Sequence, residues 1–146
     1  MKTVAVNRRA RYDYELLEKV EAGIVLTGAE AKSCRNGHIN LAGAYVSFLG
    51  GKPTLKNASI SRYAYTGPAF PHEEKRDRLL RLKKSDCERL QRASEEKGNA
   101  IIPLEVHAGK TIKVLLGLGK GRKKLDKRQA IKERETGRRL REGREE

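Results

Sequence analysis

YDYELLEKVEAGIVL, residues 12–26, is the stretch of sequence that decides the fold class. Its aromatic and aliphatic residues fall on even numbers: Tyr12, Tyr14, Leu16, Val20, Ala22, Ile24 and Leu26. A period of two places such residues on one face of a β-strand, whereas a helix would need a period of 3.6. The stretch therefore predicts a half-buried strand pair near the start of the chain.

Two sequence patterns of the capping-box type predict helices outside this stretch. Residues 27–30, TGAE, predict a short helix that Gly37 ends, and residues 85–88, SDCE, predict a second helix that Gly98 ends. In such a box the first side chain accepts from a free backbone N–H of the first turn, and the glutamate returns a bond to the cap residue.

Further strands follow from alternation and turn residues. Residues 44–49, the Gly50-Gly51 turn and a return strand near 54–60 predict a hairpin, and residues 100–107 and 111–118 predict a final strand pair. Five or six antiparallel strands with two helices fit a small OB-like or Greek-key β-barrel. A flat α+β sheet with its helices on one side is the alternative. We predict a mainly β fold, an OB-like antiparallel barrel with two to three short helices and a basic C-terminal tail.

The charge of the chain indicates a polyanionic partner. Its 146 residues hold 33 Lys and Arg against 19 Asp and Glu, a formal net charge of +14, and 36% of them are charged. The charged fraction of an ordinary soluble domain is roughly 25%. No apolar run is long enough to span a membrane, and the first residues lack an apolar signal segment. We therefore expect a cytoplasmic protein without a membrane partner.

The basic charge is concentrated near the C-terminus. Residues 119–132 hold seven basic side chains and one acidic one, whereas residues 133–146 hold five of each sign. Beyond residue 124 only four side chains are apolar, too few to offset the entropy of ordering the segment. We predict a folded body over residues 1–118 and a tail over residues 119–146 that is disordered when free and becomes helical on a polyanion.

The motifs of enzymes and metal proteins are absent from the sequence. Cys34 and Cys87 lie far apart and the three histidines are scattered, so we predict reduced thiols and no metal site. The run GLGKGR, residues 117–122, has Arg122 where a dinucleotide-binding fingerprint needs glycine. We therefore expect no catalytic site and no cofactor.

The same glycine-rich run has a second interpretation, as an element that lies against RNA. Gly117, Gly119 and Gly121 would let the main chain approach a sugar-phosphate backbone. The basic side chains in and after the run, Lys120, Arg122, Lys123 and Lys124, would contact phosphates. An ordinary basic linker is the alternative. Because aromatic residues are few, folded RNA read by its shape fits better than single strands that stack on aromatics.

Three long strings resemble the small protein B family, the SsrA-binding proteins of bacterial trans-translation. They are NRRARYDY (residues 7–14), EAGIVLTGAEAKS (residues 21–33) and GLGKGRKKLDKR (residues 117–128), and the similarity extends in order from residue 7 to residue 135. The resemblance implies a non-enzymatic adaptor with an OB-like barrel. It would bind the tRNA-like domain of tmRNA and, with elongation factor Tu, bring the alanylated RNA to the A site of ribosomes stalled without a stop codon. The tail would form a helix in the empty mRNA channel, and the nascent peptide would be tagged for proteolysis.

The resemblance also assigns residues by position. The tmRNA-facing residues would be Asn7, Arg8, Arg9, Arg11, Tyr12, Glu21, Tyr45, Leu80, Lys120, Arg122 and Lys123. Those at the decoding centre and in the mRNA channel of the ribosome would be Asp126, Lys127, Arg128, Ile131, Lys132 and Arg134. Tyr12 stands where the family usually has histidine. A monomer is expected. The alternatives from other classes are a basic structural or assembly protein of the ribosome and a small enzyme that acts on RNA.

Overall fold

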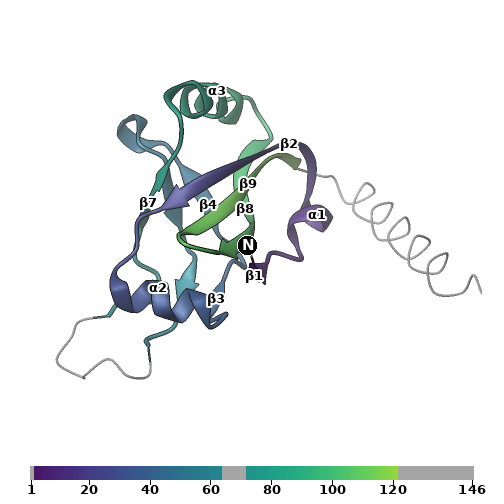
Figure 1. The fold of residues 1–146 in the computed structure, drawn as a ribbon. Coiled ribbons are helices and arrows are strands. Elements are labelled where there is room, and N and C mark those ends of the chain that lie inside the picture. Colours follow the sequence, from purple (N-terminus) through teal and green to yellow (C-terminus); the bar gives the residue numbers. More distant parts are fainter. Residues whose placement is uncertain (1, 64–71, 122–146) are drawn as a thin grey trace, which may run out of the picture.

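The computed structural model describes residues 2–63 and 72–121, and these residues form a mainly β fold with three short α-helices (Figure 1). The helices are α1 (Ala10–Asp13), α2 (Gly28–Arg35) and α3 (Lys84–Ser94), and η1 (Leu49–Gly51) is a 3-10 turn. The strands are β1 (Lys2–Val6), β2 (Tyr14–Ile24), β3 (Ile39–Asn40), β4 (Tyr45–Ser47), β5 (Thr54–Lys56), β6 (Ser59–Ile60), β7 (Arg78–Arg81), β8 (Asn99–Ala108) and β9 (Ile112–Gly121). The predicted class, mainly β with two to three short helices, is confirmed.

The sheet is antiparallel and strongly curled, but it does not close. Seven strands follow the order β1-β8-β9-β2-β7-β5-β4, and β3 and β6 form a separate pair. The sheet curls until β4, at one end of the order, packs against β8 near the other end. Within residues 2–63 and 72–121 no ladder joins β4 to β8 or β1, so the predicted closed barrel is not formed. At this seam β8 is ten residues long, but β4 has only three residues and can supply few backbone hydrogen bonds.

The stretch that predicted a strand pair forms one long strand instead. Tyr12 lies in α1, and β2 then runs along β9 with a bulge at Leu17, which is 52% exposed. An extra residue in one strand turns all later side chains to the opposite face. Tyr14 and Leu16 therefore face one side of the sheet, whereas Val20 and the later even-numbered residues face the other side.

One of the two predicted helix caps is confirmed and the other is wrong. Thr27 Oγ1 accepts a hydrogen bond from the backbone N–H of Glu30 (3.1 Å), and Glu30 Oε1 accepts one from the backbone N–H of Thr27 (3.0 Å). Gly37 follows α2 with φ of 79°, a left-handed conformation that suits glycine. The second box does not form, because α3 begins before Ser85 and its N-cap residue, Lys83, makes no side-chain cap bond.

The predicted hairpin is confirmed, but its return strand is divided and β7 was not predicted. β4 pairs with β5, and Asn57, with φ of 63°, separates β5 from β6. In β7 the alternate residues Arg78 and Leu80 point into the interior. An arginine at an inward position hides the apolar alternation on which strand prediction depends.

Two apolar clusters lie on opposite faces of the central strands. The main core fills the inside of the curled sheet and includes Leu55, Leu90 and Val114. A smaller cluster on the outer face consists of Ala10, Ile102 and Leu104 with partly buried neighbours from β2, β8 and β9. This second cluster seats α1 on the outside of the sheet, near the point where β9 ends (Figure 1).

Candidate nucleic-acid interface

The segment of residues 7–13, here called the arginine arm, is fixed to the outer face of the sheet. The backbone N–H of Asn7 donates to Leu104 O (2.7 Å), and Asn7 Nδ2 donates to Pro103 O (2.9 Å). Ala10 is 3% exposed and packs in the outer cluster. The two hydrogen bonds from Asn7 thus attach the arm to β8.

Because Ala10 occupies the inward position of the arm, its arginines point outward. Arg8, Arg9 and Arg11 are exposed. The Arg9 guanidinium lies 4.8 Å from the centre of the Tyr12 ring and 3.5 Å from a carboxylate oxygen of Asp13. Both contacts restrict its orientation. Three cations on a well-anchored turn are suited to contacting RNA phosphates.

Lys120 lies at the same end of the sheet as the arginine arm. It is exposed near the end of β9 and pairs with Glu15 of β2, one residue after Tyr14, which directly follows α1. Arg11 and Lys19, with Tyr14 between them, line a shallow hollow on the outer face. The structure therefore brings the predicted arm and Lys120 to the same end, with basic side chains on both faces.

The glycines before Lys120 have a structural role that differs from the prediction. β9 runs three residues beyond its predicted end at Leu118, so Gly117 and Gly119 are buried inside the sheet. A Cβ atom at Gly119 would lie 2.8 Å from Tyr14 Cβ, and one at Gly117 would lie 2.9 Å from Leu104 Cδ1. These two glycines make room for side chains of the outer cluster, and they cannot also lie against an RNA backbone.

Glu21 lies on the outer face far from Lys120. It pairs with Leu115, whereas Lys120 pairs with Glu15, so the two sites are about 20 Å apart along the strands. Glu21 Oε2 is 3.2 Å from Nδ1 of His107 on β8. His107 Nε2 is in turn 2.8 Å from Glu105 Oε1. Neither His107 nor Glu105 was singled out in the sequence, because they become neighbours of Glu21 only across β9.

Tyr45 and Leu80 differ in their access to solvent. Tyr45 is 43% exposed and lines a groove of about 730 Å³ at the open seam between β4 and β8, to which Asn7 and Arg9 also contribute. Leu80 is 5% exposed and belongs to the main core, which contradicts a direct contact with RNA. Its neighbour Leu79 is the exposed apolar residue of β7.

The remaining assigned residues lie outside the described part of the chain. These are Arg122, Lys123, Asp126, Lys127, Arg128, Ile131, Lys132 and Arg134. Among the described residues, no group of three or more acidic, histidine or cysteine side chains is arranged to hold a metal ion. No helix in those residues is long and apolar enough to cross a membrane.

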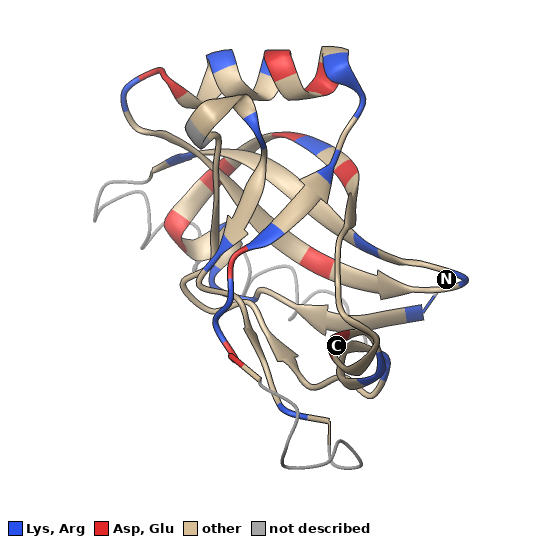
Figure 2. Ribbon diagram, turned by 90° about the vertical axis from the view of Figure 1, so that its left-hand side faces the viewer, with Lys and Arg blue, Asp and Glu red and all other residues tan. Residues whose placement is uncertain are grey.

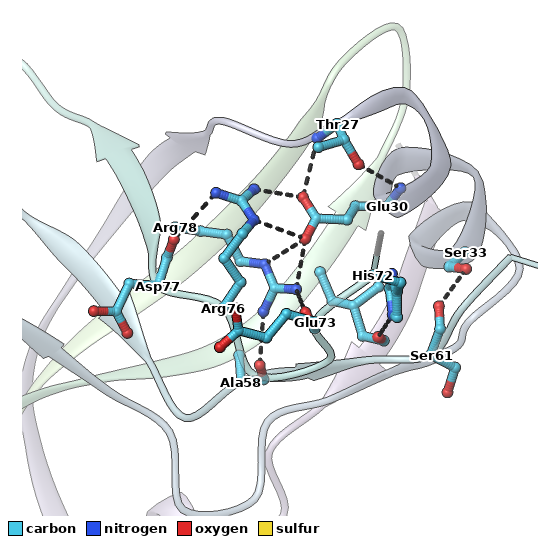
Figure 3. Close-up of polar contacts among 11 residues, drawn as sticks. Thr27, Glu30, Ser33, Ala58, Ser61, His72, Glu73, Arg76, Asp77 and Arg78 are labelled. Carbon is cyan, nitrogen blue, oxygen red and sulfur yellow. Dashed lines mark hydrogen bonds and ion pairs between the residues drawn. The ribbon is translucent and has the colours of Figure 1, made fainter. Parts of the chain in front are cut away.

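A buried ion cluster on the α2 side was missed by the sequence analysis (Figure 3). Glu30 is 3% exposed and Arg78 is fully buried. Arg78 Nη2 and Nε donate to Glu30 Oε2 (2.6 and 3.0 Å), and Arg76 Nη2 donates to Oε1 (2.6 Å). Burial alone would raise the pKa of Glu30, but hydrogen bonds from Arg76, the Thr27 backbone and Arg78 lower it to about 2.

The ion cluster changes how the basic charge of the body is assigned. Arg76 and Arg78 belong to the most basic segment of the body, residues 75–84, yet both neutralise Glu30 inside the protein. α3 carries both signs of charge (Figure 2), and Arg89 forms ion pairs with Glu18 and Asp86. The other basic side chains of that segment, Lys75, Arg81, Lys83 and Lys84, are exposed. The arginine arm and these four residues are therefore two groups of exposed cations on the body.

Known proteins resemble this chain over almost its full length. The family model described as "SmpB protein" matches residues 4–145. The chain belongs to the SmpB family. An SsrA-binding protein of Lactobacillus helveticus is 48% identical over 139 residues, which cover 94% of this chain and 91% of the relative. One of Prochlorococcus marinus subsp. pastoris is 45% identical over 140 residues, which cover 95% of this chain and 80% of the relative.

The fold is also similar to a solved member of the SmpB family. A chain in the structure described as "tmRNA-SmpB: a journey to the center of the bacterial ribosome" superposes with a TM-score of 0.70 at 37% identity. The similarity covers 90% of this chain and 95% of that chain. The resemblance found in the sequence strings is thus confirmed at the level of the family.

Proposed function

We propose that this chain is the RNA-binding adaptor of trans-translation. It binds the tRNA-like domain of tmRNA and brings the alanylated RNA to the A site of ribosomes that have stalled without a stop codon. The observation that carries the proposal is membership of the SmpB family over residues 4–145. It is supported by relatives named SsrA-binding proteins and by the similar chain solved with tmRNA and the ribosome.

In this proposal the body holds tmRNA and catalyses no reaction. The arginine arm supplies phosphate contacts, Lys120 extends them at the same end of the sheet, and Glu21 and Tyr45 contact the RNA elsewhere. Leu80 contributes only through the core, by shaping the strand that carries exposed Leu79. The protein acts as a cytoplasmic monomer, and elongation factor Tu meets it indirectly through the alanylated RNA.

The tail was predicted over residues 119–146, but β9 includes residues 119–121, so in this proposal the segment that follows β9 enters the ribosome. Arg122 and Lys123 continue the tmRNA contacts. Asp126, Lys127 and Arg128 reach the decoding centre, and Ile131, Lys132 and Arg134 enter the empty mRNA channel as a helix. An occupied channel would exclude the tail, so only ribosomes that have run out of message would be rescued and their peptides tagged for proteolysis.

A binding competition tests the tmRNA part of the proposal. Gel shifts with the tRNA-like domain should show much tighter binding than with random RNA of equal length, because base and shape contacts add to the common phosphate term. Arg11→Ala should weaken binding and lower the salt slope by about one, whereas exposed Arg92→Ala on α3 serves as the matched control. Equal affinity and equal salt dependence for both RNAs would favour the basic structural protein of the ribosome instead.

A truncation tests the division of labour between body and tail. Removal of residues 123–146 should leave folding and binding of the tRNA-like domain largely intact, because the described strands end at residue 121. Peptidyl transfer to alanylated tmRNA on stalled ribosomes should be lost. If the truncated protein no longer bound the isolated RNA, the proposed division would be wrong.

A further inference from the structure

His107 lies between two carboxylates on the outer face of the sheet. Its Nδ1 is 3.2 Å from Glu21 Oε2 on β2, and its Nε2 is 2.8 Å from Glu105 Oε1 on β8. The imidazole is only 19% exposed, whereas Glu21 is 42% exposed. Each ring nitrogen therefore faces a carboxylate oxygen that can accept a hydrogen bond. The charged imidazolium has an N–H on both nitrogens, so it can donate to both carboxylates.

The strands around His107 bring few other charges to the site. In register, His107 lies opposite Lys113 of β9 and Thr3 of β1, and Glu105 lies opposite Val6 of β1. Lys19 is two residues from Glu21 on the same strand face. Arg81 of β7 lies opposite Gly23, two residues beyond Glu21 on the same strand face. Protonation of His107 therefore adds one positive charge to a group that holds two carboxylates, two lysines and an arginine.

The geometry leaves one Glu21 oxygen available to a ligand. Oε2 is taken by His107, and Oε1 makes no hydrogen bond to the described part of the chain. The Glu21 side chain is 42% exposed, so a ligand can approach the carboxylate while Oε2 accepts from His107. A carboxylate near RNA is repelled by phosphates unless it accepts from a 2′-hydroxyl or a base N–H.

We propose that His107, supported by Glu105, is a positioning residue that orients Glu21 and offsets its charge so that Glu21 Oε1 accepts a hydrogen bond from tmRNA. This inference rests on the proposed function, which supplies the RNA. His107 need not touch the RNA, because it acts through the carboxylate that it holds. Its contribution is greatest when the imidazole is protonated.

Binding should accordingly depend on pH with a definite sign. The hydrogen bond to Glu105, and that to Glu21 after it, raise the pKa of His107 above its usual value of 6.5, although burial opposes this. Below that raised pKa the imidazolium holds Glu21. Above it the proton is lost, one carboxylate loses its donor, and the charge of the site falls by one. Affinity for the tRNA-like domain should fall about three- to tenfold from about pH 6 to about pH 8.5.

Three variants and a control test this dependence, with thermal melts to show that each is folded. His107→Ala should bind about three- to tenfold more weakly at about pH 6 and show no pH dependence. His107→Arg keeps a permanent charge with several donors, so it should restore binding and keep it constant with pH. His107→Gln keeps only a neutral donor and should fall between them. Exposed His38→Gln is the matched histidine control and should retain the wild-type profile.

A double-mutant cycle separates positioning from charge alone. In a Glu21→Ala background, His107→Ala should cause little further loss, because the residue through which it acts is gone. The full effect of His107→Ala in that background would overturn the inference. So would a wild-type pH profile in His107→Ala.

Two controls keep this inference separate from its foundation. If the wild-type protein failed to prefer the tRNA-like domain over random RNA, the proposed function would be wrong, whatever the variants showed. Single 2′-deoxy substitutions in the RNA then identify the donor. If a 2′-deoxy substitution weakens binding of the wild type but not of Glu21→Ala, the donor is the 2′-hydroxyl at that position. If no substitution behaves in this way, the donor is a base N–H.

Discussion

Replacing Arg78 by methionine should lower the free energy of unfolding by about 3–5 kcal/mol. The guanidinium is fully buried, and it donates twice to Glu30 Oε2 and once to Ala58 O (2.8 Å). Methionine has a similar length but no charge and no donor. Of its charged partners among residues 2–63 and 72–121, the Glu30 carboxylate, 3% exposed, would keep only Arg76. The cost is therefore that of a buried charge left partly uncompensated rather than that of a lost contact.

The pKa of Glu30 gives an independent value for the free energy that the ion cluster contributes. Its usual value is 4.5 and in the folded protein it is about 2. At about 1.4 kcal/mol for each pH unit, the difference corresponds to about 3 kcal/mol in favour of the ionised carboxylate. Because the pKa is lowered on folding, this stability is present above about pH 4.5 and is lost as the pH falls toward 2.

Urea unfolding followed by circular dichroism measures both effects. At pH 7 we expect Arg78→Met to be far less stable than Arg76→Ala, because the Arg76 side chain is 40% exposed. The double variant Glu30→Gln with Arg78→Met should regain part of the loss, since it removes the unpaired charge. The difference between the wild type and Glu30→Gln should shrink as the pH falls from about 4.5 toward 2.

The reasoning would be refuted by two results. If Arg78→Met lost less than about 1 kcal/mol, the buried ion cluster would not be a main source of stability. If the double variant were less stable than Arg78→Met by the full cost of Glu30→Gln, the effects would be additive, and the stranded carboxylate would not explain the loss.

Two further predictions concern packing and thiol reactivity. Gly119→Ala should destabilise the protein by about 1–3 kcal/mol in the same urea assay, because its methyl group would lie 2.8 Å from Tyr14 Cβ. Gly28→Ala is the control and should be close to neutral, because there is open space around Gly28. Equal stability of the two variants would contradict the packing argument. Cys34 should react with iodoacetamide more slowly than Cys87 in the native protein, because Cys34 is 0% exposed and burial raises its pKa to about 12. Mass spectrometry measures the two alkylation rates. Equal rates would mean that the α2 region opens readily.

The sequence predicted where strands and helices occur better than it predicted which side chains point into the core. Even-numbered alternation from Tyr12 to Leu26 predicts one side of a strand pair, but the bulge at Leu17 divides these residues between two clusters on opposite faces. A bulge is set by the pairing of β2 with β9, a distant contact that local periodicity does not encode. The capping box at Thr27, in contrast, is a bond between residues three apart, and the sequence predicted it correctly.

The candidate site was predictable where it depends on exposed residues in one short segment. Arg8, Arg9 and Arg11 are neighbours in the sequence, and all three are exposed. His107 and Glu105 could not be found this way, because they reach Glu21 only across an intervening strand. Family resemblance assigned Glu21 to the interface, and only the three-dimensional arrangement supplies its partners.

Charge alone cannot separate arginines that bind a partner from arginines that hold the fold. The segment of residues 75–84 is as notable for its basic charge as the arginine arm, yet Arg78 is fully buried and Arg76 shares its partner Glu30. A buried carboxylate attracts cations as RNA phosphates do. Arginines that pair with such a carboxylate and arginines that bind RNA therefore look the same in the sequence. Burial distinguishes them. In the arm a small residue, Ala10, turns inward and leaves the guanidinium groups in solvent, whereas in β7 the arginine itself turns inward. Variants of the exposed arginines in the arm should therefore alter RNA binding more than stability, and Arg78 variants should alter stability first.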